Sequence, residues 1–68
     1  MSERGFGDRI RKVRIERGWS QETLATRATV SRPTIARIER GDDVSTATLV
    51  RVASALGLTV EIASAGHE

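Results

Sequence analysis

The sequence WSQETLATRATVSRPTIARIERG, residues 19–41, predicts two short helices separated by a brief connection. Ser20 precedes the first, which is expected over residues 21–28. Ser31 precedes the second, which runs to about Glu39. Serine is favoured immediately before a helix because its hydroxyl accepts a hydrogen bond from a free backbone amide of the first turn. We therefore expect two capped helices in close succession.

The second of these helices has an apolar face and a basic face. Ile35 and Ile38 lie on one side of a helical wheel. The opposite side carries Arg32, Pro33, Ala36, Arg37 and Arg40. Two short helices joined by a tight turn form a helix-turn-helix, whose second helix fits the major groove of DNA with its N-terminal half nearest the bases. Because arginine can donate two hydrogen bonds to guanine, we expect Arg32 and Arg37 to read bases.

Two further helices flank this pair. Phe6, Ile10 and Val13 recur at helical spacing and predict a helix that ends at about Arg17. A fourth helix, capped by Ser45 or its neighbour, follows the i, i+3, i+4, i+7 pattern. Its apolar positions are Leu49, Val52, Ala53 and Leu56.

The pattern changes after the fourth helix. Leu58, Val60 and Ile62 alternate with less apolar residues, which is the spacing of a β-strand. A lone strand leaves its backbone groups unpaired, so we expect it to pair with the same segment of a second chain; the alternative is a frayed tail. The expected division is a DNA-binding domain over residues 1–57, a dimerisation strand over 58–63 and a disordered tail over 64–68.

Charge is distributed unevenly along the 68 residues, whose net charge is +2. Residues 1–40 hold ten Lys/Arg against five Asp/Glu, whereas residues 41–68 hold one against four. A basic first half suits a polyanionic partner, although arginines spread over solvated helix faces are the alternative. The chain has no cysteine, no membrane-spanning run and no signal-peptide core, which favours the cytoplasm and, for a DNA-binding protein, the nucleoid.

Residues 6–57 resemble the lambda-repressor/Cro-like helix-turn-helix family of transcriptional regulators. The matching positions are Gln21, Leu24, Ala25, Val30, Ser31, Ile35, Ile38, Glu39, Gly41, Leu49 and Gly57. The resemblance implies an all-α DNA-binding domain of four to five helices, here with a short C-terminal strand that pairs across a dimer. It also implies that the partner is double-stranded DNA.

The resemblance further implies roles for individual side chains. Gln21 and Ser31 would hold phosphates from the starts of the second and third helices. Arg14 would pair with Glu39 and also present one edge of its guanidinium to the phosphate backbone. Arg40 is placed for the backbone rather than for the bases.

This sequence departs from the family pattern at three places. Thr29 stands where members usually have glycine, so either the threonine is strained or the turn is altered. Pro33 replaces a polar base reader and offers an apolar contact to a thymine methyl group, while Thr34 can contact either base or phosphate. Asp42 and Asp43 occupy a loop where basic or polar residues are common. Pro33 also allows the helix to begin one residue late, because it biases the preceding residue away from helical angles.

No catalytic arrangement is evident. The single histidine, His67, lies in the expected tail, the carboxylates are scattered, and no cluster has the spacing of metal ligands. We therefore expect no enzyme activity, no cofactor, no metal and no small-molecule ligand. The leading expectation is a sequence-specific regulator, a repressor that binds a near-palindromic operator as a homodimer.

The ending ALGLTVEIAS, residues 55–64, resembles antitoxins of the HipB type. Such proteins neutralise a toxin partner and repress their own operon. A phage Cro-like or stand-alone regulator is the alternative, as is a module whose main role is protein interaction.

Overall fold

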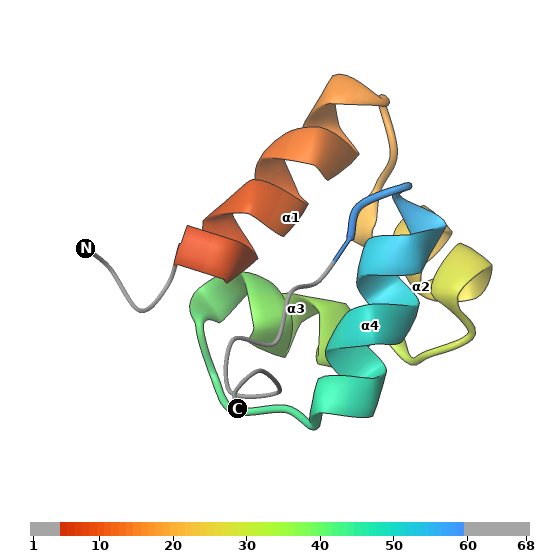
Figure 1. Ribbon diagram of the computed structural model, residues 1–68. Helices are drawn as coiled ribbons and strands as arrows, with labels where there is room; N and C mark the ends of the chain where they lie inside the picture. Colours follow the sequence, from red (N-terminus) through yellow and green to blue (C-terminus); the bar gives the residue numbers. More distant parts are fainter. Residues whose placement is uncertain (1–4, 60–68) are drawn as a thin grey trace.

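The computed structural model describes residues 5–59, which form four helices and no strand (Figure 1). These are α1 (Gly5–Glu16), α2 (Gln21–Ala28), α3 (Arg32–Arg40) and α4 (Thr46–Ala55). α3 packs against both α1 and α2, and α4 packs against α2. Over the described residues the expectation of an all-α fold is confirmed. No helix among them is long and apolar enough to cross a membrane.

A serine caps each of α2, α3 and α4. The hydroxyls of Ser20, Ser31 and Ser45 accept hydrogen bonds from the backbone amides three residues onward, at 3.0, 3.3 and 3.1 Å respectively. In each case that third residue is a threonine whose hydroxyl also bonds to the serine. These caps satisfy donors that have no partner inside the helix, so they fix where three of the four helices begin.

α3 begins at Arg32, directly after its cap, and not one residue later as the proline bias allowed. The backbone amide of Thr34 donates to the carbonyl of Ser31 at 3.1 Å, so the first turn is closed in spite of Pro33. A proline is tolerated in this turn because its missing N–H would have no intrahelical acceptor.

Thr29 keeps the turn between α2 and α3 in its left-handed conformation, with φ 61° and ψ 45°. Its backbone amide donates to the carbonyls of Ala25 and Thr26, and the amide of Val30 also donates to Ala25. Of the two expected outcomes, the strained threonine is therefore found and the altered turn is not. A β-branched residue in this region costs about 1–2 kcal/mol relative to the helical region.

The core lies between the four helices and combines the apolar faces expected from the sequence. Its buried residues are Ile10, Leu24, Ala25, Ala28, Ile35, Ile38, Val52, Ala53 and Leu56. Phe6, Val13, Trp19, Val30, Val44, Leu49, Ala55 and Leu58 pack partly buried around it. This core holds α3 by one face only, which leaves the other face exposed.

Gly7 allows α1 to approach the end of α3 more closely than any other residue would. It is buried, and a Cβ atom built on it would overlap the carbonyl oxygen of Ile38. Sequence periodicity did not single out this glycine, because a glycine in a helix carries no apolar signal.

The described chain ends just after α4, before most of the predicted dimerisation strand. Leu58 and Thr59 lie in no strand; the amide of Leu58 donates to the carbonyl of Ala53 at 2.8 Å and its side chain packs on the core. Val60, Ile62 and the predicted tail over 64–68 lie outside the described residues. The strand and its pairing across a dimer stay predictions.

Candidate nucleic-acid interface

The outward face of α3 carries the side chains that were predicted to meet DNA. Arg32, Pro33 and Arg37 are exposed there, as is Arg40 at the end of the helix. On the opposite face Ile35 is fully buried. α3 is thus anchored along one side and presents a basic surface along the other, which is the form of a helix that can enter a groove.

The side chains on this face differ in how far they are already engaged. Among residues 5–59, no side chain pairs with the exposed guanidinium of Arg37. Thr34 is half-buried, and its hydroxyl lies 2.8 Å from the Ser31 hydroxyl, which also accepts from the Thr34 amide. Arg37 is therefore the most available hydrogen-bond donor on α3, whereas Ser31 and Thr34 bond to each other.

The predicted pair of Arg14 and Glu39 is present and joins α1 to the end of α3. Arg14 Nε donates to Glu39 Oε2 at 2.7 Å, and Arg14 Nη2 donates to Oε1 at 3.1 Å. The third nitrogen, Nη1, donates to the carbonyl of Trp19 at 2.8 Å. With side-chain exposures of 12% and 5%, the pair is largely removed from water. Little of the Arg14 guanidinium is therefore exposed for the contact with phosphate that was expected from the sequence.

Gln21 extends this pair into a polar network that ends at Arg32. Its side-chain amide nitrogen donates to Glu39 Oε1, and its oxygen accepts from Arg32 Nη1, both at 3.1 Å. The chemistry fixes this orientation of the amide, since only its NH₂ can donate to a carboxylate and only its oxygen can accept from a guanidinium. We refer to Arg14, Glu39, Gln21 and Arg32 together as the polar network.

The polar network connects the scaffold to the first residue of α3. Among residues 5–59, Glu39 is the one charged residue that is buried, and no buried side-chain nitrogen or oxygen in that range lacks a partner. The pairing of Gln21 with Glu39 and Arg32 was not predicted from the sequence. The one feature of the sequence that could have indicated this pairing is that Gln21 and Arg32 each stand directly after a capping serine, at the starts of neighbouring helices.

Arg40 forms a second ion pair, and this one is exposed. Its Nη2 and Nε lie 2.7 and 3.2 Å from Asp42 Oδ2, and the two side chains are 64% and 48% exposed. The arginine predicted to bind phosphate is thus held by an acidic residue two positions later. Asp43 is also exposed but forms no ion pair among residues 5–59.

Backbone groups add anion-binding capacity at the starts of α2 and α3. Both helices begin at exposed serines, and the first backbone amides of a helix point outward without an intrahelical acceptor.

In the part of the chain that the structure describes, no three His, Cys, Asp or Glu side chains gather where they could hold a metal ion.

Comparison with known proteins agrees with this geometry. Residues 10–62, well over half of the chain, match the model of a protein family described as helix-turn-helix. The matched range includes all of α2, α3 and α4 and most of α1. No curated protein sequence matches the chain.

Proposed function

The chain belongs to the helix-turn-helix family of the lambda-repressor-like type, and from this membership we propose that it is a sequence-specific transcriptional regulator that represses by binding double-stranded DNA. The observation that carries the proposal is α3 itself. One face is buried in the core at Ile35 and Ile38, and the other presents Arg32 and Arg37 to solvent. A rigidly mounted basic helix can place these side chains against base edges in the major groove.

Within this proposal the residues of α3 have different tasks. Arg37 reads a base, because its guanidinium has no competing partner among the described residues. Arg32 reads a second base from a position that the Gln21 oxygen restricts. Pro33 offers an apolar contact to a thymine methyl, and Thr34 borders the same surface.

Phosphate contacts would come from the exposed amides at the starts of α2 and α3 and from Arg40 once it leaves Asp42. Arg14 and Gln21 act mainly by positioning, since their polar atoms are used inside the polar network. The phosphate contacts would hold α3 in register on the duplex without reading its sequence.

A homodimer would place two copies of α3 in successive major grooves about 34 Å apart, on a near-palindromic operator. The support for dimerisation is the alternation of apolar residues at Leu58, Val60 and Ile62, which suits a strand shared between two chains. We propose that this assembly acts in the cytoplasm at the nucleoid, as a binding protein rather than an enzyme and without a cofactor.

The finer proposal is an antitoxin that represses its own operon and neutralises a toxin protein. Its support is the likeness of residues 55–64 to antitoxins of the HipB type. A phage Cro-like or stand-alone regulator would share the DNA-binding face but have no toxin. Expression together with the neighbouring open reading frame separates these cases: co-purification and relief of toxicity support the antitoxin, and a neighbour that is neither toxic nor bound contradicts it.

Repeated selection from a pool of random-sequence duplexes tests DNA recognition itself. The proposal predicts enrichment of one motif with two inverted half-sites whose centres are about 10 base pairs apart. Recovery of duplexes with no shared motif after several rounds, from a protein that is folded by circular dichroism, would contradict sequence-specific binding.

A further inference from the structure

We propose that a second basic surface is a docking site for an acidic segment of a partner protein; it is formed by Arg17 and Arg27 beside Trp19 and by Arg51, which shares a hollow with Arg27. We call it the tryptophan surface. Arg17 and Trp19 lie in the connection between α1 and α2, Arg27 lies in α2 and Arg51 in α4, and none belongs to α3. The inference does not rest on the DNA-binding function proposed above.

Trp19 is the centre of this surface. The guanidinium carbon of Arg27 lies 4.5 Å from the centroid of the indole ring, and that of Arg17 lies 5.4 Å away. Arg17 is also held by the carbonyl of Leu56, to which its Nη2 donates at 2.8 Å. The ring is half-buried and both arginines are exposed, so two cations lie beside one aromatic ring.

Arg51 extends the surface along α4. Arg27 and Arg51 border one shallow hollow of about 530 Å³, whose wall also includes Thr29 and Ser54. Arginine guanidinia bind carboxylates through paired hydrogen bonds, and hydroxyls can complete such a contact. The hollow therefore offers an acidic side chain two cations from two different helices.

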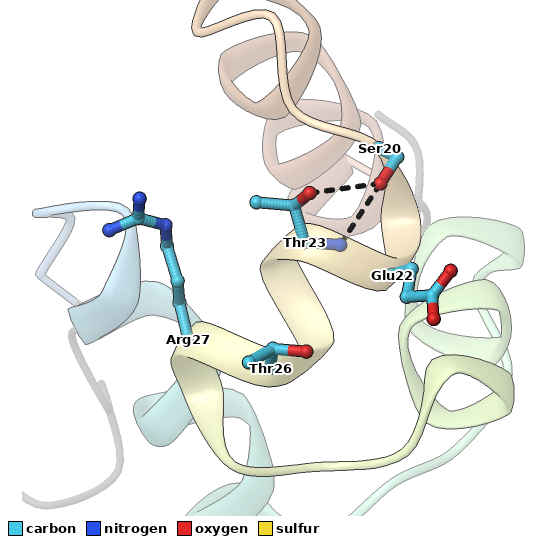
Figure 2. Close-up of a pocket in the computed structure, with 5 residues that line it drawn as sticks. All are labelled: Ser20, Glu22, Thr23, Thr26 and Arg27. Carbon is cyan, nitrogen blue, oxygen red and sulfur yellow. Dashed lines mark hydrogen bonds between the residues drawn. The ribbon is translucent and has the colours of Figure 1, made fainter.

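The cations of the tryptophan surface are not neutralised by neighbours in the described part of the chain. The ion pairs found there are Arg14 with Glu39 and Arg40 with Asp42, and neither involves this surface. Glu22 lines an adjoining hollow on α2 together with Arg27, but Figure 2 shows the two side chains extending in different directions. Like charges held close together raise the energy of the free protein, and an anionic partner lowers it.

The position of the surface favours an acidic protein segment over a second stretch of DNA. The hydrogen bond from Arg17 to the carbonyl of Leu56 brings the chain after α1 against the end of α4. In Figure 1 the C-terminal ends of both helices lie higher in the view than α3, which carries the proposed reading face. The aromatic ring of Trp19 adds an apolar contact that suits a peptide containing both acidic and apolar side chains.

Trp19 is the only tryptophan of the chain and reports directly on this surface. A deca-glutamate peptide is titrated into the full-length protein at low salt, and Trp19 fluorescence is followed. We expect a saturable change in emission. The double variant Arg27→Gln/Arg51→Gln should weaken peptide binding about tenfold, as expected for the loss of two charge contacts.

The matched control is Arg9→Gln/Lys12→Gln, which removes the same charge from an exposed part of α1. It should change peptide affinity less than twofold. Equal losses in the two double variants would show general electrostatic attraction and overturn the proposal, as would the absence of any fluorescence change. Should the first variant unfold, Arg51→Gln alone serves, because its side chain makes no hydrogen bond or ion pair among residues 5–59.

Affinity for a mixed-sequence duplex distinguishes this surface from the DNA interface. The Arg27→Gln/Arg51→Gln variant and the charge-matched control Arg9→Gln/Lys12→Gln should bind the duplex with the same affinity. A tenfold greater loss of duplex binding than in the control would assign the surface to DNA and overturn the peptide site. If neither double variant nor the unmodified protein binds any DNA, that result counts against the proposed function and not against the peptide site.

Discussion

Two neighbouring residues at the end of α3, Glu39 and Arg40, form ion pairs whose shortest contacts are equal but whose surroundings are opposite. Each pair has an N–O distance of 2.7 Å. The pair of Glu39 with Arg14 is 5% and 12% exposed, whereas Arg40 and Asp42 are 64% and 48% exposed. Distance alone therefore says little about what an ion pair does.

Burial decides the role of each pair. A buried charge that loses its partner remains out of water and uncompensated, so Glu39 and Arg14 depend on each other for the fold. An exposed pair gains little because water and salt compete for both charges. Asp42 can thus release Arg40 to a phosphate at small cost, while the polar network stays fixed and holds Arg32.

The largest predicted effect comes from breaking the buried pair. Glu39→Ala should lower the free energy of unfolding by about 3–5 kcal/mol, because it leaves the Arg14 guanidinium buried without its carboxylate. Urea denaturation followed by circular dichroism measures this. The matched control, Asp42→Ala, should cost less than about 1 kcal/mol. Similar losses in the two variants would contradict the comparison.

The second effect concerns the close approach that brings α1 to the end of α3. Gly7→Ala should destabilise the fold by about 1–3 kcal/mol, because the new methyl overlaps the Ile38 carbonyl and pushes the helices apart. Gly5→Ala is the control, since a Cβ at Gly5 meets nothing within 4 Å. Thermal unfolding compares the two, and equal midpoints would show that the approach of α1 is not constrained at Gly7.

A smaller effect is expected at the link between the network and the reading face. Gln21→Ala removes two hydrogen bonds and should cost about 1 kcal/mol of stability, with Arg32 less restricted as a result. Binding to the selected operator should weaken more than binding to a scrambled duplex. Glu22→Ala is the control: Glu22 is the next residue of α2 and is exposed, so its replacement changes the helix without removing a hydrogen bond of the polar network. Unaltered discrimination between the duplexes would argue against a positioning role for Gln21.

The smallest effect is expected from releasing the exposed pair. Asp42→Asn should change the unfolding free energy by less than about 0.5 kcal/mol, and should raise affinity for any duplex by about two- to fivefold at low salt because Arg40 is freed. Asp43→Asn removes the same charge without freeing a paired arginine. Fluorescence anisotropy at several salt concentrations separates them, and identical gains in the two variants would mean that only net charge matters.

The sequence predicted those parts of the structure that depend on local rules. The predicted bounds of α2 are correct because the cap at Ser20 and the turn at Thr29 each act on adjacent backbone groups. The buried faces of α3 and α4 followed from helical periodicity. The pair of Arg14 and Glu39, 25 residues apart, came from family resemblance and not from spacing.

Contacts that depend on the relative placement of helices were not predicted. Gly7 matters only because a carbonyl of α3 lies against it, and Gln21 bonds to Arg32 only because α2 and α3 begin near each other. Asp42 was recognised as a departure from the basic or polar residues common in its loop, but its ion pair with Arg40 depends on how the chain turns after Gly41, where φ is 90°.

In the proposed interface, Arg37 reads sequence from α3 while Arg40 contributes only charge. The most direct test measures dissociation constants of Arg37→Ala and Arg40→Ala on the selected operator and on a scrambled duplex. For Arg37→Ala we predict a loss of about 1–3 kcal/mol on the operator and little on the scrambled duplex. For Arg40→Ala we predict equal losses on both and a salt slope lower by about one. Equal losses on both duplexes for Arg37→Ala would contradict base reading by Arg37.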